Sequence, residues 1–158
     1  MQPMLKTAID AARAAGTLIN RAALNLDQIK VGQKSAHEYV TEIDQEAENI
    51  IREQLLTAYP KHAFEGEESG VSGHVKSNCR WIVDPIDGTT NFIHGLPHYA
   101  ISIAMEQDGK IEHAVIYNPA TNDLFTASRG SGAFLKDGAN ADRKLSGKNG
   151  TGFYIQVK

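Results

Sequence analysis

The stretch Trp81–Phe92, which reads WIVDPIDGTTNF, constrains the fold of this chain more than any other. Its opening apolar residues predict a short buried strand. Pro85 predicts that the strand ends at Asp84, because proline pushes the preceding residue into extended geometry and fixes its own φ. Asp87 follows three residues later, and the small polar residues 88–91 are typical of the first turn of a helix. Two carboxylates at a strand end beside a helix N-terminus suit metal ions bridged to a phosphate.

Length, charge and cysteine content exclude several classes of protein. With 158 residues the chain is expected to form one domain, and its net charge of −3 argues against a generic nucleic-acid-binding surface. The single cysteine, Cys79, excludes an internal disulfide and a cysteine-based zinc cluster. No segment reaches about 18 consecutive apolar residues, and the N-terminus lacks the pattern of a secretory signal. We therefore expect a cytoplasmic protein that does not bind membranes.

Apolar periodicity predicts helices early in the chain and mostly strands later. Apolar residues recur every three to four positions over 4–26 and 42–59, which predicts two amphipathic helices. The other predicted elements are a weak hairpin over 29–31 and 39–41, a strand from 63 that gives way to loop through 79, strands over 99–106, 111–117 and 123–128, a strand and turn over 130–138, and a possible strand over 153–157. This order predicts an α+β fold in which the two helices cover one face of a largely antiparallel sheet.

Several polar residues before the central stretch have both a structural and a functional interpretation. Thr41 and Asp44 have nearly the spacing and chemistry of a capping box, so Asp44 is expected to stabilise the start of the helix over 42–59. From its local sequence alone, Lys34 is interpreted as a solvated loop lysine. The acidic cluster over 65–68 is either a solvated loop or a cation site.

Three segments of the chain resemble those of the inositol monophosphatase family of metal-dependent phosphatases. Gly66–Ser69, which reads GEES, resembles one family segment, and Asp84–Phe92, which reads DPIDGTTNF, resembles the family signature. The segment from Lys34-Ser35 through Val40-Thr41 to Asp44 resembles a third. The similarity covers residues 4–136, and bacterial members of the inositol-1-monophosphatase type look most similar.

The resemblance implies a role for each matching residue. One Mg²⁺ would be bound by Glu67, Asp84 and the Ile86 carbonyl, and a second by Asp84 and Asp87. The phosphate and substrate would be held by Asp87, Gly88, Thr89 and Thr90. The catalytic residues would be Glu67, Thr89 and Asp44, which form a relay that orients the attacking water. Glu68 would not bind the metal directly but would stabilise the residues that do. Lys34 would lie on a loop that closes over the site.

The resemblance also implies a missing half. Family members continue into a second α/β domain with a W-D-x-A-A-G motif, whose aspartate binds the second metal, but the only tryptophan here is Trp81. We expect residues 1–143 to form the N-terminal α+β domain, which is the first half of the αβαβα layered sugar-phosphatase fold. Residues 144–158 are expected to be a tail that does not match the family, and the C-terminal domain to be absent. A full-length member is expected to be a homodimer.

The residue types and the resemblance together imply an enzyme. The expected activity is a Mg²⁺-dependent phosphomonoesterase that hydrolyses myo-inositol monophosphate or a related polyol or sugar phosphate by metal-activated water. Oxygen-only ligands suit Mg²⁺ better than zinc. The alternative is a non-catalytic, truncated half-fold that binds metal weakly or acts as an interaction subunit, because the second metal is one ligand short and one sheet face is left uncovered.

Overall fold

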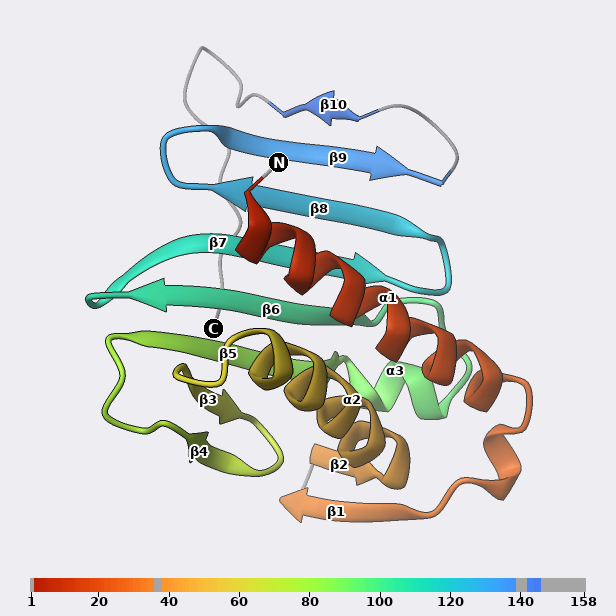
Figure 1. Ribbon diagram of the computed structural model, residues 1–158. Coiled ribbons are helices and arrows are strands. Elements are labelled where there is room, and N and C mark those ends of the chain that lie inside the picture. The colour runs from red at the N-terminus through yellow and green to blue at the C-terminus, as the bar shows by residue number, and fades with distance from the viewer. Residues whose placement is uncertain (1, 36–37, 139–141, 146–158) are drawn as a thin grey trace.

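The computed structural model describes residues 2–35, 38–138 and 142–145 (Figure 1). Its helices are α1 (Pro3–Ala23), the short 3-10 helix η1 (Leu26–Gln28), α2 (Glu42–Ala58) and α3 (Thr89–Ile93). Its strands are β1 (Val31–Ser35), β2 (Glu38–Thr41), β3 (Ala63–Gly66), β4 (Gly70–Gly73), β5 (Cys79–Asp87), β6 (Ala100–Gln107), β7 (Lys110–Asn118), β8 (Asp123–Ser128), β9 (Gly132–Asp137) and β10 (Arg143–Lys144). The possible strand over 153–157 lies outside the described residues.

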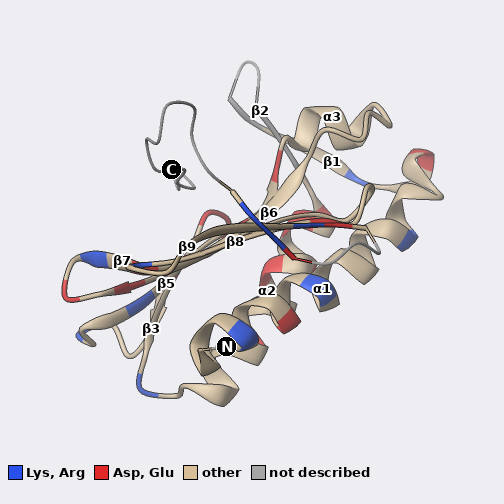
Figure 2. Ribbon diagram, turned by 90° about the horizontal axis from the view of Figure 1, so that it is seen from above, with Lys and Arg blue, Asp and Glu red and all other residues tan. Residues whose placement is uncertain are grey.

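The strands form one large sheet and one small hairpin. The large sheet has the order β10-β9-β8-β7-β6-β5-β3-β4, and its strand pairs are antiparallel except for β3 with β5. β1 and β2 form a separate antiparallel hairpin, as predicted, but its first strand lies over 31–35 rather than 29–31, so Lys34 belongs to a strand and not to a loop. Both long helices lie on the same face of the large sheet (Figure 2). The predicted α+β fold, with two helices on a largely antiparallel sheet, is confirmed.

The hydrophobic core lies between the two long helices and the large sheet. Its largest fully buried apolar side chains come from α1, α2, α3 and the central strands: Ile19, Ile51, Leu55, Phe64, Trp81, Phe92, Ile101, Ile103, Met105 and Val115. Side chains alternate across a strand, so the intervening residues point away from the helices. One such row crosses the sheet through Asp84, Ser102, Ile116, Phe125 and Leu135.

α1 packs closely against the sheet because its inner stripe carries small residues. Pro3 occupies the start of the helix, where its missing N–H is not needed. A Cβ on Gly16 would lie 2.6 Å from the ring of Tyr117, so only glycine fits this crossing without displacing the ring. α1 ends at Ala23 rather than at residue 26, because Asn25 leaves helical geometry with φ −138° and ψ 53° and the 3-10 turn follows.

α2 begins at the predicted capping box. The Thr41 hydroxyl accepts a hydrogen bond from the backbone N–H of Asp44, and the Asp44 carboxylate accepts one from the backbone N–H of Thr41. Both residues are buried, with 2% and 1% of their surface exposed. The cap therefore lies inside the protein and fixes the start of α2 against its neighbours.

β5 extends further than the sequence predicted. Pro85 does not end the strand at Asp84, because β5 runs through to Asp87. The register with β6 shifts between these aspartates: Asp84 is paired with Ser102 and Asp87 with Ala100. Such a bulge accommodates a proline, which cannot donate a hydrogen bond to the ladder.

The segment after β3 differs from the loop that was predicted there. Residues 70–73 form β4, which pairs antiparallel with β3 and turns 63–73 into a hairpin. Gly70 and Gly73 have φ of +74° and +72°, a backbone conformation that glycine adopts without strain. Ser72 accepts a hydrogen bond from Arg52 of α2 at 2.9 Å. The hairpin thus extends from the sheet towards α2.

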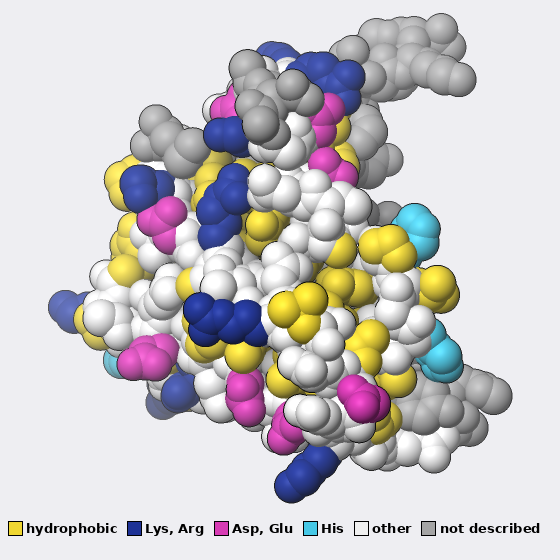
Figure 3. Space-filling view, turned by 90° about the vertical axis from the view of Figure 1, so that its right-hand side faces the viewer, with side chains coloured by type: hydrophobic (Ala, Val, Ile, Leu, Met, Phe, Trp, Pro, Cys, Tyr) yellow, Lys and Arg dark blue, Asp and Glu magenta, His cyan; other side chains and the backbone are white. Residues whose placement is uncertain are grey.

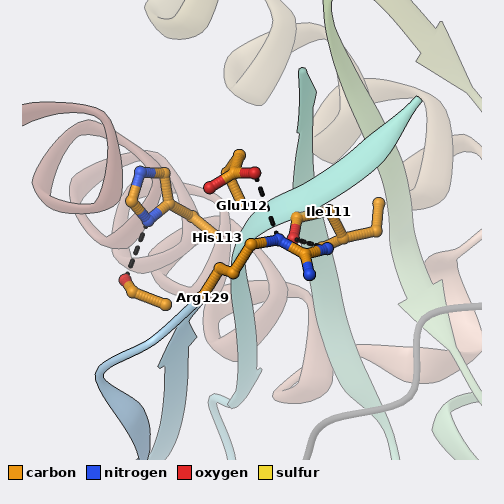
Figure 4. A network of polar contacts seen from close by, with 5 residues as sticks. Ile111, Glu112, His113 and Arg129 are labelled. Atoms are coloured by element: carbon orange, nitrogen blue, oxygen red, sulfur yellow. Dashed lines mark hydrogen bonds and ion pairs between the residues drawn. The ribbon is translucent and has the colours of Figure 1, made fainter. Parts of the chain in front are cut away.

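Polar contacts connect β7 with Ser128 at the end of β8 and with Arg129, which follows it (Figure 4). The Arg129 side chain donates to the Glu112 carboxylate at 3.1 Å and to the Ile111 carbonyl at 2.9 Å. On the helix side of β7, the His113 Nδ1 lies 2.8 Å from the Ser128 hydroxyl. His113 is 8% exposed, so this bond is largely shielded from water.

The helices of the described residues are too short or too polar to cross a membrane.

Hydrophobic side chains nevertheless reach the surface in places. Figure 3 shows the end of the molecule where α1 stops and α3 lies, and hydrophobic side chains gather there between charged ones. Leu24, just after α1, is 82% exposed, and Leu96, just after α3, is 51% exposed.

Candidate metal and phosphate site

Three carboxylates gather in a cavity at the carboxyl end of β5. Glu67 directly follows β3, and Asp84 and Asp87 belong to the end of β5. Because β3 and β5 are parallel neighbours, their carboxyl ends lie together. The cavity has a volume of about 300 Å³ and is lined by Glu65, Gly66, Glu67, Ile82, Val83, Asp84, Asp87, Ala100, Ser102 and Ile116. The structure therefore brings together the three carboxylates that the sequence selected.

The pKa of Asp84 is strongly raised by its surroundings, from its ordinary value of 3.8 to about 8. Burial is the largest cause, and a hydrogen bond with Glu67 and the negative charges of Glu67 and Asp87 act in the same direction. The N–H of Ile86 donates to this carboxylate and opposes the rise in pKa. The Asp84 Oδ1 is buried and has no hydrogen-bond partner among the described residues. At neutral pH and without metal, the Asp84 carboxyl is thus mostly protonated and hydrogen-bonded with Glu67.

A divalent cation fits this arrangement chemically. The site offers carboxylate oxygens, a buried oxygen that lacks a partner, and like charges that a cation would neutralise. As they stand, the described residues form no group of three or more His, Cys, Asp or Glu side chains that closes around a metal. Glu67 and Asp84 instead bond to each other, and a cation would take the place of the proton between them.

The residues that the resemblance predicts to hold the phosphate run from the end of β5 into α3. Gly88 precedes α3 with φ +97°, and a Cβ there would lie 2.7 Å from the carbonyl oxygen of His98, so glycine is required for both conformation and space. The Thr89 hydroxyl lies 2.8 Å from Asp44 Oδ1 and 3.1 Å from the Ile86 carbonyl oxygen. Asp44 therefore caps α2 and also contacts Thr89, as both of its interpretations require.

The remaining predicted site residues lie around this centre. Glu65 is engaged by an ion pair with Arg80 at 2.8 Å, which leaves Glu67 as the cavity's acid from this hairpin. Thr90 is exposed in the first turn of α3, outside the cavity lining. Glu68 is half-buried at the hairpin tip. Lys34 lies in β1, and its side chain is outside the described part of the structure.

Glu48 is a buried acid near the site that the sequence motifs did not indicate. Glu48 of α2 is 1% exposed, and its carboxylate accepts a hydrogen bond from the backbone N–H of Glu68 at 2.9 Å. The available signal was its position: Glu48 lies one turn after Asp44 and next to Ala47 on the apolar side of the helix. A charge on the buried side of a helix requires a specific partner.

Known proteins resemble the chain along most of its length. Nus factor SuhB of Pseudomonas aeruginosa is 53% identical over 137 residues, which cover 85% of this chain and 51% of that protein. Inositol-1-monophosphatase of Rhizobium meliloti is 46% identical over 134 residues, which cover 85% of this chain and 50% of that protein. The chain thus spans about half the length of the curated relatives it matches.

Solved structures give the same result for the fold. The crystal structure of the extragenic suppressor protein suhB from Bartonella henselae matches with a TM-score of 0.85 at 43% identity, covering 92% of this chain and 54% of that chain. The model of the inositol monophosphatase family matches residues 1–154, which includes part of the segment after 143. The fold and the sequence agree with the resemblance drawn from the three motifs, and the chain belongs to the inositol monophosphatase family.

Proposed function

We propose that this chain carries the metal and phosphate site of a Mg²⁺-dependent phosphomonoesterase. The observation that carries the proposal is the cavity shared by Glu67, Asp84 and Asp87, in which one Asp84 oxygen is buried without a partner. The substrate class is myo-inositol monophosphate or a related polyol or sugar phosphate, a choice that the relative named inositol-1-monophosphatase supports. The Ile86 carbonyl, at the same bulge of β5, would be the backbone ligand beside the carboxylates.

The chain's own residues would supply orientation and proton acceptance. Bound Mg²⁺ would neutralise the phosphate charge and lower the pKa of the attacking water. Thr89 donates its single hydroxyl hydrogen towards Asp44, so the Thr89 oxygen is left to accept a hydrogen from that water. Glu67 would accept the second hydrogen. Asp87, Gly88, Thr89 and Thr90 would hold the phosphate beside this pair, and Glu68 and Lys34 would support the surrounding segments.

Phosphate release from myo-inositol 1-phosphate tests the proposal directly. The 158-residue chain is expected to release phosphate only with Mg²⁺, and Asp84→Asn to lower that rate by about 100-fold or more, the equivalent of several kcal/mol of lost charge stabilisation. Asp108→Asn is the matched control, because Asp108 is an exposed aspartate in the β6–β7 turn with φ 51°, which asparagine tolerates. A wild-type chain without Mg²⁺-dependent turnover contradicts catalysis by this chain.

The second candidate function is a non-catalytic interaction subunit that binds metal weakly. Two observations favour it: the 53% identical relative is named Nus factor SuhB, and apolar side chains such as Leu24 and Leu96 are exposed at one end of the molecule. This candidate predicts a Mg²⁺-induced rise in melting temperature only at high Mg²⁺, no turnover, and the same phosphate release from Asp84→Asn as from wild type. Those outcomes together would favour it over the enzyme.

A further inference from the structure

Glu48 is a buried carboxylate for which the proposed chemistry has no use. It lies on the inner side of α2, 1% exposed, in a helix whose other buried positions are mostly apolar. Burying a carboxylate is costly unless strong hydrogen bonds compensate. The bond that the structure gives it is the backbone N–H of Glu68, the residue next to the proposed metal ligand Glu67.

Glu48 is one of three polar residues on successive turns of α2 that each hold a segment near the site. Residues four apart on a helix share a face, so the three side chains form one stripe. The three bonds run from Thr89 to Asp44 (2.8 Å), from the Glu68 N–H to Glu48 (2.9 Å), and from Arg52 to Ser72 (2.9 Å). α2 thereby connects the end of β5 with both the tip and the returning strand of the β3–β4 hairpin.

Gly66 shows how closely Glu48 approaches the hairpin tip. A Cβ on Gly66 would lie 2.3 Å from Glu48 Oε1 and 2.4 Å from its carboxyl carbon. Gly66 is not among the glycines with positive φ, so the glycine provides space for the carboxylate and not a special backbone conformation. From the other side, the Glu67 N–H donates to the Val83 carbonyl at 3.0 Å. The tip is therefore held between α2 and β5.

We propose that Glu48 is a positioning residue, whose carboxylate fixes the Gly66–Glu68 turn and so holds the Glu67 side chain beside Asp84. The consequence for Mg²⁺ rests on the proposed function. The positioning itself rests only on the hydrogen bond to Glu68, the burial of Glu48 and the space at Gly66. Groups that orient metal ligands typically change metal affinity or activity 10–100-fold when they are removed.

Two substitutions of similar size separate positioning from simple packing. Glu48→Gln keeps an oxygen that can accept the Glu68 N–H, whereas Glu48→Leu fills the space without an acceptor. If Glu48 positions Glu67, the Mg²⁺ concentration that gives half of the maximal melting-temperature shift rises about 10–100-fold in Glu48→Leu, and Glu48→Gln remains near wild type. If Glu48 matters only for packing, Glu48→Leu and Glu48→Gln differ in melting temperature without Mg²⁺, but both reach half of the maximal shift at the same Mg²⁺ concentration as wild type. That result overturns the proposal.

Hydrogen–deuterium exchange of the metal-free chain gives a readout that does not depend on the proposed function. The Glu68 amide is expected to exchange faster in Glu48→Leu than in wild type or Glu48→Gln, while core amides such as that of Ile103 keep their protection. Glu53→Gln, an exposed acid on the same helix, is the control. If the wild type shows no Mg²⁺-induced shift, the proposed function fails, and exchange alone decides the role of Glu48. Unchanged exchange at Glu68 overturns the proposal.

Gly66→Ala tests the same contact if Glu48→Leu does not fold. The added methyl group would displace the Glu48 carboxylate without removing its charge. We expect faster exchange at Glu68 and a weaker Mg²⁺ response, and we expect the double variant Gly66→Ala/Glu48→Gln to be no better. A Gly66→Ala chain with wild-type exchange at Glu68 and a wild-type Mg²⁺ midpoint overturns the proposal.

Discussion

Asp84 destabilises the metal-free chain at neutral pH, and its substitution should reveal this. The pKa of Asp84 is about 8 in the folded chain against an ordinary 3.8, so between these values the folded state binds one more proton than the unfolded state. The free energy of unfolding therefore falls as pH rises from about 4 to about 8. Asp84→Asn should melt at a higher temperature than wild type at pH 8 without metal, by about 2–4 °C for each kcal/mol gained.

Thermal melts in a chelating buffer at pH 5 and pH 8 check this prediction. The advantage of Asp84→Asn over wild type should grow with pH, and added Mg²⁺ should raise the melting temperature of wild type but not that of the variant. A difference that stays constant between the two pH values would contradict the raised pKa of Asp84.

The Thr89 hydroxyl is expected to matter for both turnover and stability. Thr89→Val removes the donor to Asp44 Oδ1, which lies 2.8 Å away. Loss of proton-transfer assistance typically lowers a rate about 10²–10⁴-fold, and a buried acceptor left without its donor costs about 1–3 kcal/mol. Thr89→Ser keeps the hydroxyl and should keep most of both. Steady-state kinetics with Mg²⁺ and thermal melts measure the two effects, and equal turnover by Val and Ser variants would exclude the hydroxyl from catalysis.

At the scale of single elements, α1 packs closely against β7 because Gly16 has no side chain. Gly16→Ala should gain about 1 kcal/mol of helix propensity but lose about 1–3 kcal/mol through overpacking, because its Cβ would lie 2.6 Å from the Tyr117 ring. Tyr117 is 6% exposed and its hydroxyl donates to Asn122, so the ring has little freedom to move. The net expectation is destabilisation.

Urea denaturation of a double-variant cycle measures the Gly16 effect. In a Tyr117→Leu background the methyl group has more room, so Gly16→Ala should cost less or become stabilising. If Gly16→Ala stabilises the wild-type chain, the close approach of α1 to β7 is not a constraint.

Elements whose local pattern coincides with their tertiary environment could be predicted from the sequence. The apolar stripes of α1 and α2 and the capping box at Thr41 are of this kind, and so are the alternating strands after residue 98. β4 was missed because Gly70–Gly73 is exposed and glycine-rich, and it forms a strand only through pairing with β3. The continuation of β5 past Pro85 was missed because the bulge depends on the register with β6.

The sequence motifs were sufficient to identify the carboxylates of the site, but not Glu48, which hydrogen-bonds next to one of them. Glu67, Asp84 and Asp87 lie in short segments that resemble the family, and they line one cavity. The contact of Glu48 with the Glu68 N–H joins residues twenty positions apart and depends on how α2 lies against the hairpin. No local pattern encodes that distance.

At the scale of the whole molecule, the half-buried His62 and the buried His113 should weaken the fold in acid. Burial lowers the pKa of His62 and of His113 below the ordinary 6.5. The unfolded chain then binds more protons than the folded chain, so the stability that these residues contribute is present above pH 6.5 and is lost as pH falls through the folded pKa values. His62→Gln/His113→Gln should therefore lose less stability than wild type between pH 8 and pH 5.

The test compares the change in melting temperature between pH 8 and pH 5 in the double variant with the same change in the wild type. Asp84 is present in both chains, so its effect on stability cancels in this comparison. The expected difference is about 2–4 °C for each kcal/mol of proton linkage removed. His98→Gln, at an exposed histidine, is the control and should follow wild type. A double variant whose acid sensitivity equals that of wild type would contradict the lowered pKa values.

The bulge in β5 changes the parity of the strand. In a regular strand, residues three positions apart point to opposite faces, so Asp84 and Asp87 would be divided between the cavity and the core. One extra residue between them restores even parity, because their partners Ser102 and Ala100 are two positions apart on β6. D-x-x-D across a bulge is thus the geometric equal of D-x-D in a regular strand. A strand that kept all four residues but paired with β6 without the bulge would retain every carboxylate and still rotate one of them out of the site.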